Sequence, residues 1–211
     1  MKKLTRGKIN SFLAKHASDK RVLDIGAASG DHASMFPNAI ALDIDPARKP
    51  DIVGDAHNLP FPDASFEVVV CSEVFEHLED PRKAVSEMHR VLVSGGIIIL
   101  TTRFLFPVHD APGDYFRFTP YGLRLLFANW EIFDEECEAD SFSTIAVLLQ
   151  RIIFQSELRG GKITKGILWL FVLLFNKLDF LTIRRYGDIR RTSIVSSLLS
   201  SGIYIACRKN G

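Results

Sequence analysis

The stretch Val22–His32 reads VLDIGAASGDH and decides how the chain can fold. An apolar pair leads to Asp24, and a run of small residues follows, in which Gly26 and Gly30 let the backbone approach a ligand without side-chain obstruction. Asp31 is the predicted start of the next helix. A strand that ends in such a turn, at the carboxyl edge of a sheet, is where α/β proteins bind nucleotides. The stretch therefore predicts a ligand site of that kind.

A second apolar run, AIALDIDP at Ala39–Pro46, ends in acid at Asp43. A carboxylate at this position can accept both hydroxyl hydrogens of a ribose. Asp45 would replace Asp43 if the strand ended later. Because Asp43 directly follows the apolar run that should end the strand, it is the preferred candidate.

Two further motifs follow in order, GDAHNLPFPDASFE at residues 54–67 and SGGIIILTT at residues 94–102. Together with the opening stretch they resemble the class I S-adenosylmethionine-dependent methyltransferases, in the branch of small methyltransferases that carries GDA-x-x-LPF. The resemblance is close from Arg21 to Thr102 and looser elsewhere. It implies S-adenosylmethionine as the cofactor. It also implies a Rossmann-like, doubly wound α/β fold, with helices on both faces of a mostly parallel seven-stranded sheet whose last strand is antiparallel.

The resemblance also assigns the cofactor site residue by residue. Asp24 would lie near the ammonium group of the cofactor, and the glycine-containing turn would pass beneath its methionine and ribose portions. Asp55 and Ala56 match the family's adenine-contacting pair, although an aspartate in such a turn is often only a turn former. Ala28 stands where the family usually has glycine, and we expect binding to tolerate the extra methyl group. The predicted cofactor-binding residues are Asp24, Gly26, Ala28, Gly30, Asp43, Asp55 and Ala56.

Two other functional classes remain as alternatives. A nicotinamide dehydrogenase requires G-x-G-x-x-G, because the pyrophosphate of a dinucleotide needs close backbone approach. Counting from Gly26, this chain has Ala28 and Asp31 at the other two positions, which argues against that class. The second alternative is a protein that binds an adenosyl ligand without turnover, as a membrane-surface partner of another enzyme.

The segment Pro107–Leu123, PVHDAPGDYFRFTPYGL, follows the fifth predicted strand. It resembles the HD-x-P-x-D-Y-x-R-(F/Y)-T motif of bacterial methyltransferases associated with saccharide or cell-envelope synthesis. By that resemblance His109 and Asp110 face the acceptor, while Tyr115 and Arg117 shape its pocket. His109 is the preferred base, because an imidazole has the pKa nearest working pH. The alternative is a structural loop, pinned by an ion pair between Arg117 and Asp114 and packed by the neighbouring phenylalanines.

The fourth predicted strand is followed by SEVFEH, which contains Glu76 and His77. This pair resembles the E-H pair of the same methyltransferase branch, where it packs against the mouth of the active site. His77 is therefore a third catalytic candidate, and the alternative role for the pair is to stabilise a helix or loop. The D/N-P-P-(Y/F) motif of amino-directed nucleic-acid methyltransferases is absent here, which argues against methylation of DNA bases.

The remaining pattern alternates strands and helices, which predicts a parallel sheet with right-handed crossovers. Asp80-Pro81 and Thr119-Pro120 each place a capping side chain before a proline and so predict helix starts. The first of these helices should end at Gly95-Gly96, and the second should run through Leu126. The predicted strands are Arg21–Asp24, Ala39–Asp43, Asp51–Gly54, Phe66–Ser72, Ile97–Thr101, Trp130–Cys137 and Gly202–Cys207.

Length and composition favour a single methyltransferase domain over residues 1–211, since a chain of this size can bury a sizeable core. A net charge of +1 gives no field that would recruit nucleic acid. Residues 1–20 lack the long apolar core of a secretory signal and predict a short amphipathic helix with a basic outer face. The chain contains three cysteines, predicted to be reduced, buried thiols of a cytoplasmic protein: Cys71, Cys137 and Cys207. Their spacing predicts no metal site.

Residues 141–201 are the predicted apolar helical insertion before the last strand. Its two apolar runs, IAVLLQRIIF and GILWLFVLLF, are much shorter than the about 20 residues of a membrane span. One interpretation is a lid over the active site. The other is a helix in the membrane interface, with its basic flanks on anionic headgroups, and the two can coexist.

The sequence therefore predicts a methyltransferase for a small-molecule, saccharide or lipid-linked acceptor. A hydroxyl is the preferred target, ahead of a nitrogen or carbon atom. The expected location is the cytoplasm, at the inner face of the membrane if residues 141–201 contact lipid.

Overall fold

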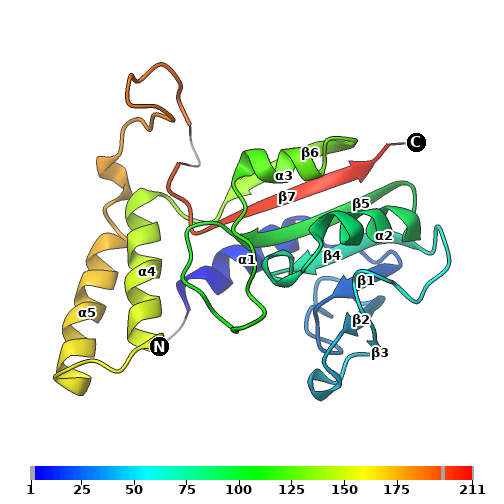
Figure 1. Ribbon diagram of the computed structural model, residues 1–211, viewed down its shortest axis with the longest axis horizontal. Helices are drawn as coiled ribbons and strands as arrows, with labels where there is room; N and C mark the ends of the chain where they lie inside the picture. Colours follow the sequence, from blue (N-terminus) through cyan, green and yellow to red (C-terminus); the bar gives the residue numbers. More distant parts are fainter. Residues whose placement is uncertain (1–2, 196–197, 211) are drawn as a thin grey trace.

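The computed structural model describes residues 3–195 and 198–210, so the first two residues of the predicted 1–20 helix and residues 196–197 of the predicted insertion lie outside it. Within the described residues, one seven-stranded sheet has the order β3-β2-β1-β4-β5-β7-β6 (Figure 1). Strands β1 to β5 are parallel, and β7 is antiparallel to β5 and β6. The strands are β1 (Val22–Ile25), β2 (Ala39–Asp43), β3 (Ile52–Val53), β4 (Phe66–Ser72), β5 (Leu92–Arg103), β6 (Trp130–Cys137) and β7 (Gly202–Lys209). The predicted fold class is confirmed.

Helices cover both faces of the sheet. On one face, Phe12 and Leu13 of α1 pack against alternate residues of the central strands, Val68 among them. On the other face, Met88 of α2 and Leu123 of α3 pack against the intervening residues. The helices are α1 (Leu4–Lys15), α2 (Pro81–Val91), α3 (Pro120–Leu126), α4 (Ser141–Gln155) and α5 (Gly161–Phe175), with short 3-10 turns η1 (Pro46–Arg48), η2 (Phe75–His77) and η3 (Asp179–Leu181).

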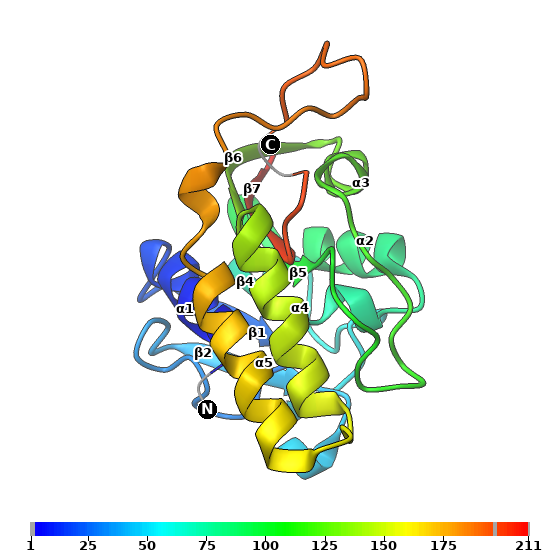
Figure 2. The same cartoon turned by 90° about the vertical axis from the view of Figure 1, so that its left-hand side faces the viewer.

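Helices α4 and α5 lie between β6 and β7 in the sequence and stand side by side beyond the carboxyl ends of the parallel strands (Figures 1 and 2). They share a small core of their own around Ile153 and Val172. The amide of Leu4 donates to Gln150 of α4 at 3.0 Å, and Gln155 donates to the carbonyl of Val108 at 3.1 Å. α4 is thereby joined both to the start of α1 and to the segment that follows β5. Among the described residues, no helix is long and apolar enough to cross a membrane.

The predicted helix start at Asp31 is wrong. Residues 31–35 form hydrogen-bonded turns, and the Asp31 carboxylate accepts from the preceding amide of Ala28 at 3.0 Å instead of capping a following helix. Pro37 follows closely, and it leaves too few residues for a stable helix because the residue before a proline is disfavoured in the α region. The chain between β1 and β2 is therefore a compact turn.

The predicted helix end at Gly95-Gly96 is also wrong. α2 ends at Val91, and both glycines lie inside β5, which starts at Leu92. A β-carbon on Gly96 would lie 3.0 Å from the carbonyl oxygen of Val93 and 3.2 Å from that of Glu67. Gly96 therefore permits a close backbone approach beside an irregular register of β4 and β5, whereas Gly95 has open space around it and a positive φ of +72°; neither caps a helix.

Other predicted elements agree with the structure within the usual uncertainty of element ends. Asp80 accepts from the amides of Arg82 and Lys83 at the start of α2, and Thr119 accepts from the amide of Gly122 at the start of α3. β5 and β7 are longer than predicted. Cys71 and Cys207 are buried and none of the three cysteines forms a disulfide, but Cys137 is only half-buried, which corrects the prediction of three buried thiols.

Candidate functional site

Two neighbouring cavities open where the parallel strands end. The strand-end cleft, of about 700 Å³, lies between the ends of β1 and β2, residues 54–57 and residues 73–79. The α4 cavity, of about 410 Å³, lies between α1, residues 103–110 and α4. The two volumes are in the range of small-molecule sites. Both cavities are lined by Gly26, Arg48, Glu73, His77 and Asp110, so they meet along a shared wall.

Asp24, the last residue but one of β1, is a buried carboxylate with one unsatisfied oxygen and lines neither cavity. Its Oδ2 lies 2.7 Å from Nδ1 of His32, whereas its Oδ1 is buried without a hydrogen-bond partner. Burial raises the pKa of Asp24, and the hydrogen bond to Asp24 raises the pKa of His32. A buried unpaired acceptor is costly, so this oxygen is suited to a donor brought by a ligand.

Gly26 forms the wall shared by the two cavities. Its φ is +79°, and a β-carbon there would lie 2.1 Å from Cγ2 of Val74. Glycine is therefore required both by the backbone conformation and by the space. Gly30 also has a positive φ, of +81°, but a β-carbon there would meet nothing within 4 Å. Neither Gly30 nor Ala28 lines either cavity.

Asp43 ends β2 and lines the strand-end cleft, as do Asp55 and Ala56. Its carboxylate accepts from the amide of Asp45 at 2.9 Å and lies 3.2 Å from Nε of Arg48. Asp45 instead accepts from the amide that starts η1. The preference for Asp43 over Asp45 as the end of the strand therefore agrees with the structure. Arg48, which sequence reasoning missed, is the present partner of the Asp43 carboxylate.

The GDA-x-x-LPF segment is held by two side chains of α2. Arg90 donates to the carbonyls of Leu59 and Phe61 at 2.9 and 2.7 Å, and Glu87 accepts from the amide of Leu59 at 2.9 Å. Arg90 and Glu87 also pair with each other at 2.8 Å. Asp55 itself accepts from the amide and ring of His57. Asp55 is thus both a turn former and a residue of the cleft wall.

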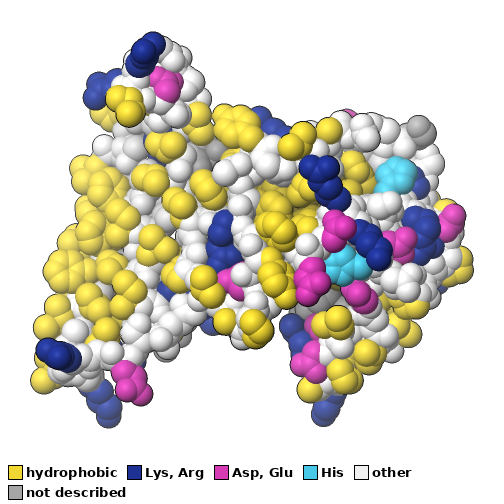
Figure 3. Space-filling view, viewed as in Figure 1, with side chains coloured by type: hydrophobic (Ala, Val, Ile, Leu, Met, Phe, Trp, Pro, Cys, Tyr) yellow, Lys and Arg dark blue, Asp and Glu magenta, His cyan; other side chains and the backbone are white. Residues whose placement is uncertain are grey.

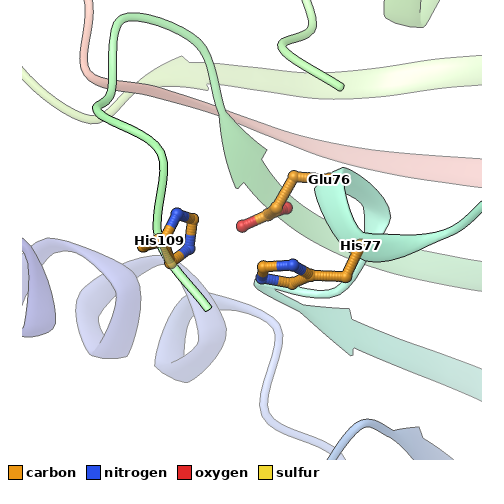
Figure 4. Close-up of side chains that lie close together, drawn as sticks. All are labelled: Glu76, His77 and His109. Atoms are coloured by element: carbon orange, nitrogen blue, oxygen red, sulfur yellow. The ribbon is translucent and has the colours of Figure 1, made fainter. Parts of the chain in front are cut away.

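Glu76, His77 and His109 come together (Figure 4), with the two histidines in the lining of the α4 cavity and Glu76 buried behind them. Glu76 is fully buried in η2, and burial raises its pKa. Its Oε2 accepts from the hydroxyl of Thr102 at 2.7 Å, while its Oε1 is buried without a hydrogen-bond partner. The backbone carbonyl of Glu76 accepts from the amide of Tyr115 at 2.8 Å. This hydrogen bond joins η2 to the segment after β5.

His77 and His109 face each other, with ring centroids 4.9 Å apart. Nδ1 of His77 lies 2.5 Å from the carbonyl oxygen of Gly113. A carbonyl only accepts, so Nδ1 carries the proton and Nε2 keeps a free lone pair. Burial lowers the pKa of His109, whose amide donates to Asp114 at 2.8 Å. The His109 imidazole is therefore available as a neutral base or ligand at neutral pH.

Arg117 is held in the loop and does not line either cavity. It forms a two-point ion pair with Asp114, at 2.6 Å, and donates to the carbonyls of Phe106 and Pro107. The hydrogen bonds from Arg117 lower the pKa of Asp114 to about 2. The structural alternative considered for this segment is thus present. Tyr115 lines the strand-end cleft and donates to Glu79 at 3.2 Å, and Asp110 lines both cavities.

The α4 cavity also contains residues that sequence reasoning missed. The guanidinium groups of Arg103 and Arg151 lie 4.2 and 4.7 Å from the ring centroid of Phe106. Arg103 forms a buried ion pair with Glu138 at 2.8 Å and a second with Glu73. A charged residue directly after the apolar run of β5 was a usable signal for Arg103. Arg151 gave none, because it belongs to α4 and reaches the cavity only through the tertiary fold.

Comparison with known proteins shows what the chain is similar to. Residues 23–100 match the family described as methyltransferase domain. The uncharacterized methyltransferase YcgJ of Bacillus subtilis is 34% identical over 120 residues, which cover 48% of this chain and 45% of that protein. The ubiquinone/menaquinone biosynthesis C-methyltransferase of Vibrio vulnificus is 30% identical over 164 residues, 67% of this chain and 61% of that protein. The chain spans about half the length of the first curated relatives that it matches.

Solved structures support the fold. The crystal structure of the [4+2]-cyclase SpnF superposes with a TM-score of 0.60 at 17% identity, covering 96% of this chain and 81% of that one. The crystal structure of YcgJ from Bacillus subtilis gives a TM-score of 0.57 at 17% identity, covering 98% and 99%. Since one of these structures is a cyclase, the structural similarity shows the fold and does not identify the reaction.

Proposed function

Because the chain contains a class I S-adenosylmethionine-dependent methyltransferase domain, we propose that it transfers a methyl group from S-adenosylmethionine to a hydroxyl of an acceptor bound in the α4 cavity. The observation that carries this proposal is the pair of cavities meeting at Gly26 and His77. The strand-end cleft has the residues expected for an adenosyl ligand. The α4 cavity has titratable groups expected for an acceptor.

The residues present fit the cofactor. Asp43 lines the cleft and suits the ribose hydroxyls, with Arg48 moving aside or sharing the carboxylate. Asp24 lines neither cavity, so its unpaired Oδ1 would reach the ammonium group only through water or after a local rearrangement. Asp55 and Ala56 on the cleft wall suit the adenine. Gly26 keeps the space between cleft and cavity free of a side chain. These assignments rest on the chemistry of the residues and on the family.

Transfer requires little acid–base chemistry from the protein. When bound, the cofactor would supply a methyl group on a positively charged sulfur, and the electron pair of the broken S–C bond would remain on sulfur as a neutral thioether. The acceptor hydroxyl loses one proton in this process. His109, with its lowered pKa, lies on the wall of the α4 cavity and can take that proton. The main contribution of the protein is to position the hydroxyl in line.

The charge of the α4 cavity favours an acceptor with an anionic group. Arg6, Arg103 and Arg151 all line it. Arg103 is already paired with Glu73 and Glu138, whereas Nε of Arg151 is buried without a hydrogen-bond partner. A phosphorylated saccharide or a lipid-linked sugar phosphate fits this lining, because guanidinium groups bind phosphate at two points. The quinone C-methyltransferases among the relatives make a lipid-tailed acceptor methylated at carbon the main competing chemistry.

A lipid-linked acceptor would be reached most directly from a membrane surface. Hydrophobic side chains gather over the α4–α5 end of the molecule (Figure 3). On α5, Ile163, Leu170 and Leu174 are 76%, 66% and 51% exposed. Lysines 162 and 165 belong to the same helix, and Lys177 follows it. We propose that this face rests on the inner surface of a membrane with anionic headgroups.

The deciding experiment has two stages. Calorimetric titration with S-adenosylmethionine, S-adenosylhomocysteine and NAD should show micromolar binding of the two adenosyl ligands alone. Transfer of isotopically labelled methyl is then measured to sugar phosphates, lipid-linked sugar phosphates and demethylated quinones. Adenosyl binding with no transfer to any class would favour the non-catalytic alternative. Binding of NAD alone would refute the proposal.

A further inference from the structure

We infer that Glu76, His77 and His109 bind one divalent transition-metal ion on the wall of the α4 cavity. One ligand atom from each residue lies within 4.8 Å of the other two. The Glu76 carboxylate points toward the space between the two imidazole rings (Figure 4). Ligands on one zinc ion lie about 2.0–2.2 Å from it, so a small side-chain rotation brings the three donors to a common centre.

Two unsatisfied atoms support a ligand at this point. Oε1 of Glu76 and Nδ1 of His109 are both buried without a hydrogen-bond partner. Nδ1 of His109 lies 3.4 Å from the Asp114 carboxylate, which is longer than a good hydrogen bond. Buried polar atoms are nearly always satisfied in folded proteins, so such atoms in one cluster call for a partner. A cation would satisfy the Glu76 oxygen and an imidazole lone pair at once.

The neighbours of the cluster already orient its donors. Metal-binding histidines usually donate their second ring N–H to a carbonyl or carboxylate. His77 does so through Nδ1 to the carbonyl of Gly113, which leaves the Nε2 lone pair free. The hydroxyl of Thr102 holds the other oxygen of Glu76. The donors are thus arranged as a ligand set whose supporting hydrogen bonds are formed in advance.

The surrounding charges permit a cation. Of the nearby guanidinium groups, that of Arg103 is paired with Glu73 and Glu138, and that of Arg117 is paired with Asp114. The charge of Arg151 also acts on His109 and opposes a cation, and the carboxylate of Asp110, which lines the same cavity, partly offsets it. Two imidazoles and one carboxylate form a donor set that suits zinc, cobalt, iron or manganese better than magnesium or calcium, which prefer oxygen ligands. The sequence alone predicts no metal site, because His109 comes from a different loop and joins the adjacent pair only in the fold.

The role of this ion rests on the proposed function. His77 lines both cavities, so an ion held there would lie where the acceptor meets the cofactor. Coordination of the acceptor hydroxyl to a divalent ion lowers the pKa of that hydroxyl and allows its proton to leave to solvent. His109 would then serve as a metal ligand and not as the base.

The test uses the full chain after dialysis against a chelator. Cobalt(II) is titrated while visible absorption is recorded, and zinc binding is measured by calorimetry. We expect one ion per chain. His109→Ala and Glu76→Gln should raise the dissociation constant on the order of 100-fold or more, beyond the 10–100-fold expected for the supporting change Thr102→Val. His89→Gln, at an exposed histidine of α2, is the matched control and should bind like the wild type.

Absence of saturable binding to the folded wild-type protein would overturn the inference. So would undiminished binding to His109→Ala, which would place the ion elsewhere on the surface. If Glu76→Gln does not fold, as judged by circular dichroism, His109→Ala alone decides. Titration of the same metal-free protein with S-adenosylmethionine separates the two proposals: cofactor binding without metal binding refutes the ion only, and metal binding without cofactor binding refutes the methyltransferase only.

Discussion

Asp43 ends β2 and Asp45 lies two residues later; both line the strand-end cleft, but their carboxylates have different partners. Asp43 is buried in the cleft wall beside Arg48, whereas Asp45 is exposed and accepts from the amide of Ala47. We expect Asp43→Ala to raise the dissociation constant for S-adenosylmethionine about 10-fold or more, because hydrogen bonds to a charged group are lost. Calorimetry should show much smaller effects for His109→Ala and for the matched control Asp45→Ala. Equal losses at Asp43 and His109 would contradict the separation of cofactor and acceptor regions.

Substitutions at Gly26 and Gly30 can separate the cost of a positive φ from the cost of a steric clash. Both have positive φ, but only at Gly26 would a methyl group overlap Val74. Gly30→Ala should lower the free energy of unfolding by about 1–2 kcal/mol, from the backbone conformation alone. Gly26→Ala should cost roughly 1–3 kcal/mol more through overpacking. Denaturant unfolding of Gly26→Ala, Val74→Ala and the double variant should show a favourable coupling, and an additive double variant would contradict the clash.

At the scale of elements, the hydrogen bonds between α2 and the segment after β3 should affect both the stability of the fold and the binding of the cofactor. Arg90 donates to the carbonyls of Leu59 and Phe61, so Arg90→Met should cost about 1–3 kcal/mol and also weaken cofactor binding through the Asp55 turn. Unfolding in urea and calorimetry measure the two effects. A stability loss with unchanged cofactor affinity would show that this segment does not touch the cofactor.

The ion pair between Arg90 and Glu87 predicts that the stability of the fold depends on pH. The hydrogen bond from Arg90 lowers the pKa of Glu87, so Glu87 stabilises the fold above its unfolded pKa of about 4.3, and this contribution is lost as pH falls through the folded pKa. The difference in unfolding free energy between wild type and Glu87→Gln should be full at pH 7 and shrink below about pH 4.3. In an Arg90→Met background Glu87→Gln should have little effect. A difference that persists at low pH would contradict the pairing.

Local chemistry explains which elements could be predicted. Asp80-Pro81 and Thr119-Pro120 are capping patterns whose hydrogen bonds close within a few residues, and both helix starts are observed. The prediction of a helix end at Gly95-Gly96 failed, because a glycine pair is compatible both with a helix end and with a strand that another backbone approaches closely. Asp31 misled because its side chain turned back to Ala28. The failure at Gly96 came from a contact with a distant strand, and the failure at Asp31 came from a competing local hydrogen bond.

At the scale of the whole molecule, residues at the ends of strands could be predicted from the sequence, whereas a cluster formed from separate loops could not. Asp24 and Asp43 could be proposed because each follows an apolar run, and the ends of neighbouring parallel strands meet at one edge. Asp43 lines the strand-end cleft, whereas Asp24 lines neither cavity. The Glu76–His77–His109 cluster and the lining by Arg151 could not be found, since they join separate loops and an inserted helix. Helix α4 of the insertion thus supplies one wall of the α4 cavity, which the strand ends alone do not enclose.

The outward face of that insertion gives the prediction that involves the whole molecule. Ile163, Ile167, Leu170 and Leu174 recur at helical spacing on α5, and all are more than half exposed. Burying each such side chain in a bilayer interface contributes about 1.5–3 kcal/mol. Ile167→Glu combined with Leu170→Glu should therefore reduce binding to vesicles of phosphatidylglycerol and phosphatidylcholine more than 10-fold. The matched control is Leu125→Glu, at a leucine of α3 that is 69% exposed.

The double variant should keep its melting temperature and its affinity for S-adenosylmethionine, because the altered side chains point away from both cavities and neither lines them. Wild-type binding should weaken with added salt and with pure phosphatidylcholine vesicles, since lysines flank the apolar face and their attraction to anionic headgroups is screened. Equal vesicle binding by the double variant and by Leu125→Glu would show that α5 does not rest on lipid. The acceptor search would then move from lipid-linked saccharides to water-soluble sugar phosphates, whose recognition by the arginines of the α4 cavity needs no membrane.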